Sequence, residues 1–140
     1  MSLNIMLSSL QKINAGKIVL VKIGAFYIAK GRDAVLLNKI LKLKNTCLEK
    51  EICKVGFPVN SLNKYIEKLN ELKYGYIVYN YDSNENRLTQ ILRKEGKINK
   101  EEEERVNCLL CKNNIKNYKK EDKYMEALSE FYKERRERMQ

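Results

Sequence analysis

The sequence predicts an α/β fold of α+β organisation: a mixed β-sheet of five or six strands flanked by helices, with a helical C-terminal extension. Runs rich in β-branched and aromatic residues, typical of strands, alternate with stretches whose apolar residues recur at helical spacing. The clearest strand is 74–81, which is dense in Tyr, Ile and Val. From residue 99 the composition becomes highly charged, so we predict two parts, residues 1–98 and 99–140.

The elements can be placed in chain order. A stripe of Leu7, Leu10 and Ile13 predicts a first helix over 3–14. We expect strands at 17–23, 25–30, 45–48, 52–57, 74–81 and 87–94, and further helices at 34–43 and 62–73. The second of these helices has an expected buried stripe of Leu62, Tyr65, Ile66, Leu69 and Leu72. Asp33 and Ser61 are the expected N-caps of these two helices. Glu49-Lys50-Glu51 is interpreted as a hairpin turn, and Gly56-Phe57-Pro58 as the end of the hairpin.

The C-terminal part is predicted to contain one or two helices. Four consecutive Glu (101–104) suit a helix N-terminus, and the Arg-rich end of the chain suits a helix C-terminus. Between them lies an apolar stripe of Tyr124, Leu128, Phe131 and Tyr132. This stripe either packs back on the sheet or docks a partner protein.

The positive charge is concentrated in the first part of the chain. The net charge is +10, and residues 1–99 hold 17 Lys or Arg against 8 Asp or Glu, whereas residues 100–140 hold 11 against 10. A basic surface attracts phosphates by counterion release, which favours a nucleic-acid partner. The alternative is a Lys-rich surface that only keeps the protein in solution.

Several function classes are excluded or disfavoured by composition. Histidine is absent, which removes His-based triads and His-ligated metals. The phosphate-binding motif of P-loop ATPases is also missing, and no paired carboxylates occupy an apolar setting. We therefore expect no catalysis and no cofactor. No apolar run is long enough to span a membrane, and the N-terminus does not resemble a signal peptide.

The four cysteines predict reduced thiols in a cytoplasmic protein, because no secretory signal accompanies them. Cys108 and Cys111 form a lone Cys-x-x-Cys. A structural zinc site needs four ligands, so Cys47 and Cys53 would have to join them. The simpler interpretation is that cysteines at i and i+3 on a helix pack as small apolar residues.

Residues 17–37 form the central stretch of the chain. Two apolar runs flank Gly24, and the adjacent aromatics Phe26 and Tyr27 follow at once. The basic residues around them are Lys22, Lys30 and Arg32. Aromatics in a basic setting can stack on bases or fill a core.

Three blocks of sequence carry a resemblance to a known family. The first is Gly24–Ile28 (Gly-Ala-Phe-Tyr-Ile), which Gly31–Ala34 follows. The second is Val55–Val59 with the helix after it, and the third is Gly75–Tyr79. In this order and spacing they resemble the N-terminal mismatch-recognition domain of the MutS family over roughly residues 8–95. The resemblance implies a free-standing copy of that domain, without the ATPase parts of full-length MutS proteins.

The resemblance also implies a set of site residues. The family's Phe, here Phe26, stacks into the duplex beside a mispaired base, and an aromatic wedge suits that work. The family's Glu two residues later bonds the displaced base, but Ile28 occupies this position and an aliphatic chain makes no such bond. Lys22, Ile23 and Lys54 match positions beside the wedge, where lysines suit phosphate contacts. The alternatives are a buried or vestigial Phe26 and ordinary surface lysines.

These observations lead to one preferred function and one alternative. The preferred function is non-catalytic binding of mispaired or irregular nucleic acid, with Phe26 stacking and Lys22, Lys30, Arg32 and Lys54 near phosphates. The ligand is expected to be DNA, with RNA or a hybrid left open, and a protein partner is expected at the C-terminal helices. The alternative is a protein-binding accessory subunit of a reverse transcriptase or another nucleic-acid enzyme.

Overall fold

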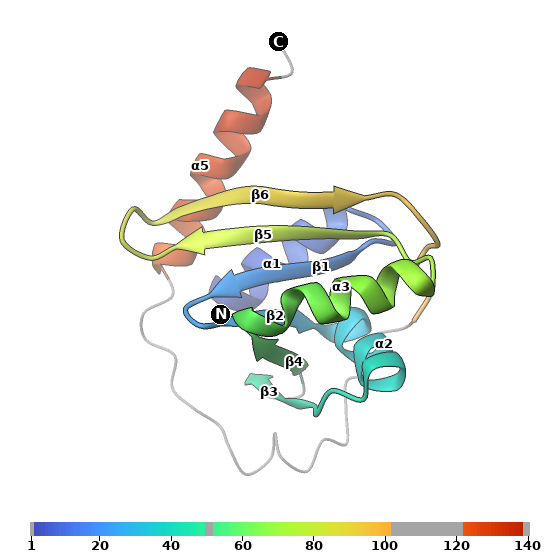
Figure 1. Ribbon diagram of the computed structural model, residues 1–140. Coiled ribbons are helices and arrows are strands. Elements are labelled where there is room, and N and C mark those ends of the chain that lie inside the picture. Colours follow the sequence, from blue (N-terminus) through green and yellow to red (C-terminus); the bar gives the residue numbers. More distant parts are fainter. Residues whose placement is uncertain (1, 50–51, 102–121, 139–140) are drawn as a thin grey trace.

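The computed structural model describes residues 2–49, 52–101 and 122–138 of the 140-residue chain (Figure 1). The helices are α1 (Ser2–Ile13), α2 (Gly31–Leu41), α3 (Leu62–Glu71) and α5 (Asp122–Arg138), with a short 3-10 turn η1 (Val59–Ser61). The strands are β1 (Ile18–Ile23), β2 (Phe26–Lys30), β3 (Thr46–Glu49), β4 (Ile52–Pro58), β5 (Tyr76–Asp82) and β6 (Arg87–Lys94). All six predicted strands are therefore present, within about three residues of their predicted limits.

The strands form one six-stranded sheet in the order β3-β4-β2-β1-β5-β6. β1 pairs with β5 in parallel, and the other neighbours pair antiparallel, so the sheet is mixed as predicted. The parallel pair needs a crossover, and the chain between β1 and β5 supplies it with β2, α2, the β3–β4 hairpin and α3. β1 lies in the middle of the sheet between β2 and β5, and the residues of β1 and β5 contribute to hydrophobic clusters on both faces.

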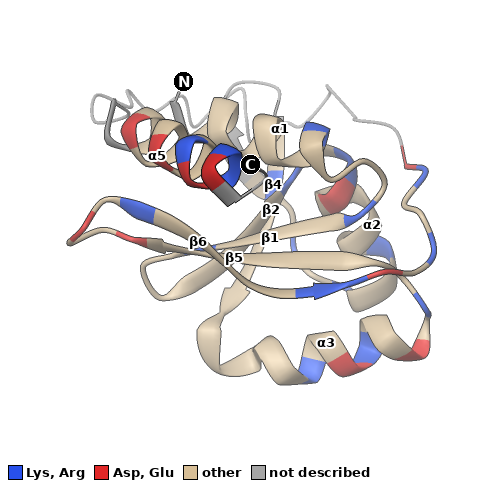
Figure 2. Ribbon diagram, turned by 90° about the horizontal axis from the view of Figure 1, so that it is seen from above, with Lys and Arg blue, Asp and Glu red and all other residues tan. Residues whose placement is uncertain are grey.

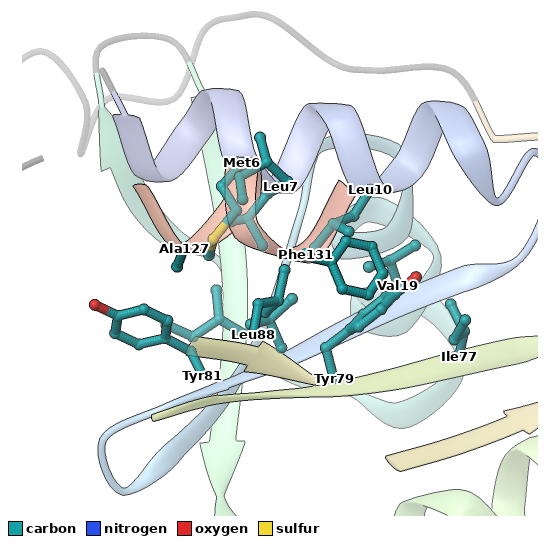
Figure 3. Close-up of a cluster of buried hydrophobic side chains, with 13 residues drawn as sticks. Met6, Leu7, Leu10, Val19, Ile77, Tyr79, Tyr81, Leu88, Ala127 and Phe131 are labelled. Atoms are coloured by element: carbon teal, nitrogen blue, oxygen red, sulfur yellow. The ribbon is translucent and has the colours of Figure 1, made fainter. Parts of the chain in front are cut away.

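Each face of the sheet has its own hydrophobic core. One core lies under α1 and α5 and contains Met6, Leu10, Val19, Ile28 and Tyr79 among others (Figure 3). The other core joins the sheet to α2 and α3 through residues such as Leu20, Leu37 and Leu69. Figure 2 shows α1 and α5 on one side of the sheet and α3 on the other. Successive residues of β1 enter opposite cores because side chains alternate along a strand.

α5 belongs to the first core. Ala127, Leu128 and Phe131 are at most 8% exposed, and the Phe131 ring meets the Tyr79 ring edge-on with centroids 5.4 Å apart. The apolar stripe that the sequence offered as a docking element for a partner therefore packs against this chain's own sheet and α1. The expected Glu run and the Cys108–Cys111 pair lie within residues 102–121, outside the described residues, apart from Glu101.

The predicted cap of α2 was wrong. α2 begins at Gly31, whose φ of +56° favours glycine, and its N-cap is Lys30 without a side-chain cap hydrogen bond. Asp33 instead is fully buried and accepts hydrogen bonds from the backbone N–H of Val19 (3.0 Å) and the side chain of Gln11 (2.9 Å). Its carboxylate thus links α1, β1 and α2.

The segment after β6 is hydrogen-bonded to Asp33 and to the turn that follows α1. The Nδ2 group of Asn99 donates to Asp33 Oδ1 at 2.8 Å, and the backbone N–H of Asn99 donates to the carbonyl of Gly16 at 2.6 Å. Asn99 is only 4% exposed. The chain therefore remains part of the folded body as it passes the predicted boundary between residues 98 and 99.

Three smaller expectations also differ from the structure. Ser61 is the N-cap of α3 but makes no side-chain cap hydrogen bond, and Leu72 is 36% exposed instead of lying in the buried stripe. Gly56 lies inside β4 opposite Ile28 and does not close the hairpin. Of the expected Glu49-Lys50-Glu51 turn, Lys50 and Glu51 lie outside the described residues.

Candidate nucleic-acid interface

The turn of the β1–β2 hairpin lies at the same end of the sheet as the β5–β6 turn (Figure 1). Ile23 pairs with Phe26, so Gly24 and Ala25 alone make the turn, and Gly24 has a φ of +64°. A positive φ at the first central residue is characteristic of type II′ turns, whose twist matches that of the strands they join. The turn residues are exposed, so the hairpin presents its tip to solvent.

Phe26 is the first residue of β2 and lies at this tip. Its side chain is 50% exposed, an unusual exposure for a ring that could have been buried. Its neighbour across the ladder is Pro58, which is also exposed, at the end of β4. The structure therefore places a partly bare aromatic ring on the surface.

Ile28 lies two residues further along β2 and is a core residue. It is 8% exposed and packs in the cluster beneath α1 and α5. The position at which the family carries its base-bonding Glu is thus turned toward the interior here. Ile28 supports the strand from within and does not reach the surface on which Phe26 lies.

Lys30 is also withdrawn from the surface. It is 4% exposed, and its Nζ donates to Asn4 Oδ1 (2.6 Å) and Ser8 Oγ (2.5 Å) of α1. Lys30 is four residues from Phe26, which corresponds to about 14 Å along a strand. Its ammonium group fastens α1 to the sheet, so the predicted phosphate contact at Lys30 is corrected to this structural role.

Arg32 lies at the same distant end of β2. Its Nη2 donates to the carbonyl of Gln11 at 3.3 Å, and its Nε lies 3.7 Å from Asp33 Oδ1. The guanidinium group therefore supports the buried carboxylate of Asp33, away from the hairpin tip. The structure does not bring Arg32 together with Phe26.

The two remaining lysines lie in different places. Lys54 of β4 pairs with Lys30 across the ladder, so it too is remote from the tip. Lys22 of β1 pairs with Tyr27, one step from the turn, and is partly exposed. No hydrogen bond or ion pair joins its ammonium group to the part of the chain that the structure describes. Of the predicted basic residues, Lys22 is the one next to the hairpin turn, but as the partner of Tyr27 it projects from the face of the sheet opposite to Phe26.

Tyr27, the other aromatic of the pair, faces the opposite core. It is 5% exposed and its ring lies 5.7 Å from that of Phe57. Burial raises the pKa of its hydroxyl group, which therefore remains protonated at neutral pH. The adjacent aromatics thus divide between the surface and the interior, as alternation along a strand requires.

One group of surface residues near the tip was not predicted as part of the site. The backbone N–H of Val59 donates to the carbonyl of Ala25 at 3.0 Å, which fastens η1 and the start of α3 to the hairpin turn. The exposed polar residues that follow are Asn60, Asn63 and Lys64. The Gly-Phe-Pro block of the sequence signalled this segment, but only the fold shows that it adjoins Phe26.

No metal site or membrane-spanning helix is found in the described ranges. Among these residues, no three His, Cys, Asp or Glu side chains lie close enough together to hold a metal ion. The described helices are too short or too polar to cross a lipid bilayer.

A mixed sheet with helices on both faces defines an α/β domain, and its β1–β2 hairpin presents an aromatic residue to solvent. The model of one family, MutS domain I, matches residues 6–117, which is most of the chain. The chain therefore belongs to the MutS domain I family, the mismatch-recognition domains of MutS proteins, as the resemblance predicted. The match extends beyond the 8–95 range expected from the sequence. A search of curated proteins gave no significant match.

Proposed function

We propose that this protein binds mispaired or otherwise irregular nucleic-acid duplexes without catalysis, and that Phe26 stacks against the bases. The observation that carries this proposal is the position of Phe26, which is half-exposed and directly follows the two-residue turn of the β1–β2 hairpin. Membership of the mismatch-recognition family supports DNA as the ligand. An apolar wedge inserts most cheaply where pairing is already broken, because less stacking is lost there.

The proposed recognition depends on deformability and stacking. Ile28 is buried and aliphatic, so the β2 strand offers no carboxylate to bond a displaced base. A ring that stacks on any base gives little sequence information. We therefore propose that the protein distinguishes a bulge or mispair from a matched duplex, but distinguishes poorly between one mispair and another.

Phosphate contacts are proposed for two lysines beside the turn, on the α3 side of the sheet, whereas Phe26 projects from the other face. Lys22 flanks the turn on β1, and Lys64 lies in the first turn of α3, which adjoins Ala25 through η1. Such contacts would fix the position of the duplex and add affinity that falls as salt rises. Lys30 and Arg32 are left out of this proposal because they hold α1 and Asp33 in place.

The test is a fluorescence anisotropy titration of labelled DNA duplexes with the full chain at two salt concentrations. Matched, mismatched and bulged duplexes of one length are compared. Phe26→Ala is expected to weaken binding to the irregular duplexes by about tenfold, since one base–aromatic stack is lost. The matched control is Ile91→Ala, because Ile91 on β6 is also 50% exposed and apolar.

The same titration separates this function from that of an accessory protein-binding subunit. If Phe26→Ala binds every duplex as the wild type does, the wedge is refuted. If the wild type itself shows no preference for irregular duplexes, mismatch binding is refuted and the accessory function becomes the better hypothesis. Equal losses in Phe26→Ala and Ile91→Ala would show only that the protein had been destabilised.

A further inference from the structure

A small pocket lies between α1, α5 and β6, apart from the hairpin tip. Its volume is about 90 Å³, and it is lined by Asn14, Tyr79, Gln90, Arg93, Phe131, Glu134 and Arg135. Most of these side chains are polar or charged, although the pocket opens from the first hydrophobic core. Polar groups gathered beside a core suggest a polar occupant.

The hydroxyl group of Tyr79 marks the floor of this pocket. Tyr79 is 1% exposed, and Figure 3 shows it rising from β5 against Phe131. The Nδ2 group of Asn14 donates both to the carbonyl of Leu10 and to the Tyr79 oxygen, each at 2.8 Å. The Tyr79 oxygen is therefore an acceptor in this bond, and its own proton has no acceptor among the described residues.

The protonation state of Tyr79 makes this proton available. Burial raises the pKa of the hydroxyl group above its usual value, and the hydrogen bond from Asn14 and the charges of Arg135 and Arg93 only partly offset the effect. The group is thus a neutral O–H donor at physiological pH. A buried donor without a partner is costly, and a ligand acceptor would remove that cost.

Two arginines complete a set of donors. Arg93 uses its Nε to bond Glu95 at 3.2 Å, and its terminal nitrogens have no hydrogen bond within the described part of the chain. Arg135 makes no hydrogen bond or ion pair with the described residues. The acidic lining residue, Glu134, is paired with Arg87 at 2.9 Å, so its charge is largely balanced.

We propose that this pocket binds a phosphate group, held by the guanidinium groups of Arg93 and Arg135, the hydroxyl of Tyr79 and the amide of Gln90. Guanidinium groups donate in a fork that matches the oxygens of a phosphate, and bonds to an ionised acceptor are the stronger ones. A phosphate carries more charge and one more terminal oxygen than a carboxylate, so two guanidinium groups favour it over a carboxylate. The phosphate could be free or could terminate a nucleic-acid strand.

This site is independent of the proposed wedge. Tyr79 of β5 pairs with Val21 of β1, and Asn14 follows the C-terminal end of α1. Phe26, by contrast, is the first residue of β2, beyond the hairpin turn. Phe26→Ala should therefore leave phosphate affinity unchanged. If phosphate does not bind in the pocket, the proposal for Phe26 is unaffected. If Phe26 does not stack on bases, the proposal for the pocket is unaffected.

The test is an NMR titration of the full chain with inorganic phosphate at constant ionic strength, with acetate as the comparison anion. Saturable shifts are expected at Tyr79, Gln90 and Arg93. Arg135→Gln and Tyr79→Phe should each weaken phosphate binding by about tenfold, because each removes a donor to a charged acceptor. Arg136→Gln is the matched control: it makes the same charge change about 100° around the helix and outside the pocket lining.

Each outcome decides the proposal. No saturable shift, or equal losses in Arg135→Gln and Arg136→Gln, would overturn it, as would acetate binding as tightly as phosphate. If Tyr79→Phe does not fold, Arg135→Gln decides alone, since Arg135 is exposed. Tighter binding of a 5′-phosphorylated DNA strand than of its 5′-hydroxyl form would identify a strand end as the source. Equal binding of the two would identify a free phosphate.

Discussion

Three side chains on one face of β2 meet three different surroundings. Phe26 is exposed at the tip, Ile28 is buried under α1 and α5, and Lys30 is bonded to Asn4 and Ser8. The sequence shows that these residues share a face, because side chains alternate. It does not show how far α1 extends over that face. The part of the face that the helix leaves uncovered is where a binding residue can lie.

At the residue scale, restoring the family's carboxylate should harm the protein. Ile28→Glu places an ionisable group at a position that is 8% exposed, so we expect the free energy of unfolding to fall by about 3 kcal/mol. Ile28→Val is the control, with a loss of about 1 kcal/mol. Urea denaturation measures both. A stable Ile28→Glu protein with improved mismatch discrimination would contradict the burial described here.

A second residue-scale prediction concerns pH. Burial raises the pKa of the Asp33 carboxyl, partly offset by hydrogen bonds from Gln11 and Val19, the charge of Arg32 and a hydrogen bond from Asn99. The folded state then holds this proton more tightly than the unfolded state. The stability contributed by Asp33 is therefore complete below the unfolded pKa, about 4, and is lost as pH rises toward the folded value.

The measurement compares wild type with Asp33→Asn by urea denaturation across this pH range. The wild type should have the larger free energy of unfolding at low pH. The difference between the two proteins should decrease as pH rises and then become constant. At every pH we expect Asp33→Asn to be weakened by about 2 kcal/mol from broken buried hydrogen bonds, on top of which the pH trend appears. An advantage that grows with pH would contradict the raised pKa.

At the element scale, α5 is as much a part of the domain as the sheet. Leu128 is 4% exposed in the first core, so Leu128→Ala should lower the free energy of unfolding by about 3 kcal/mol. Leu72→Ala, at the end of α3 where Leu72 is 36% exposed, should cost under about 1 kcal/mol. Chemical denaturation of both variants decides the matter: if their losses are equal and small, α5 is not docked on the sheet.

Most elements could be predicted because their signals are local. The β-branched and aromatic content of β1 and β5 and the stripes of α1 and α3 require no knowledge of distant residues. The start of α2 could not be predicted in this way. Asp33 resembles an N-cap locally, but contacts with Gln11, Val19 and Asn99, far along the chain, take it into the interior.

The site divides along the same line. The positions of Phe26 and Lys22 beside a hairpin turn could be predicted because the family motif and the turn signal are local, and their role in binding stays a prediction. Lys30 and Arg32 were misplaced, since only the packing of α1 shows that their charges are used inside the fold. The contact between η1 and Ala25 could not be predicted, because it depends on the pairing of strands that are far apart in the sequence.

At the scale of the whole molecule, the net charge of +10 predicts salt-dependent binding to nucleic acid. Two variants separate the effect of a lysine's position from the effect of the total charge. Lys22→Gln should weaken binding to matched and mismatched duplexes alike. It should also reduce the slope of log affinity against log salt concentration by about 1. Lys44→Gln, an exposed change with the same loss of charge, should leave the slope nearly unchanged. Equal effects would show that Lys22 makes no local contact.

The central claim, that the Phe26 ring enters the base stack, is tested most directly with 2-aminopurine placed beside a mispair. Stacking quenches this fluorescent base, so insertion of the ring should change its emission when wild-type protein binds, and should do so much less in a matched duplex. Phe26→Ala at saturating concentration should give no such change, while Ile91→Ala should behave as wild type does. The same emission change from Phe26→Ala and wild type would contradict the account.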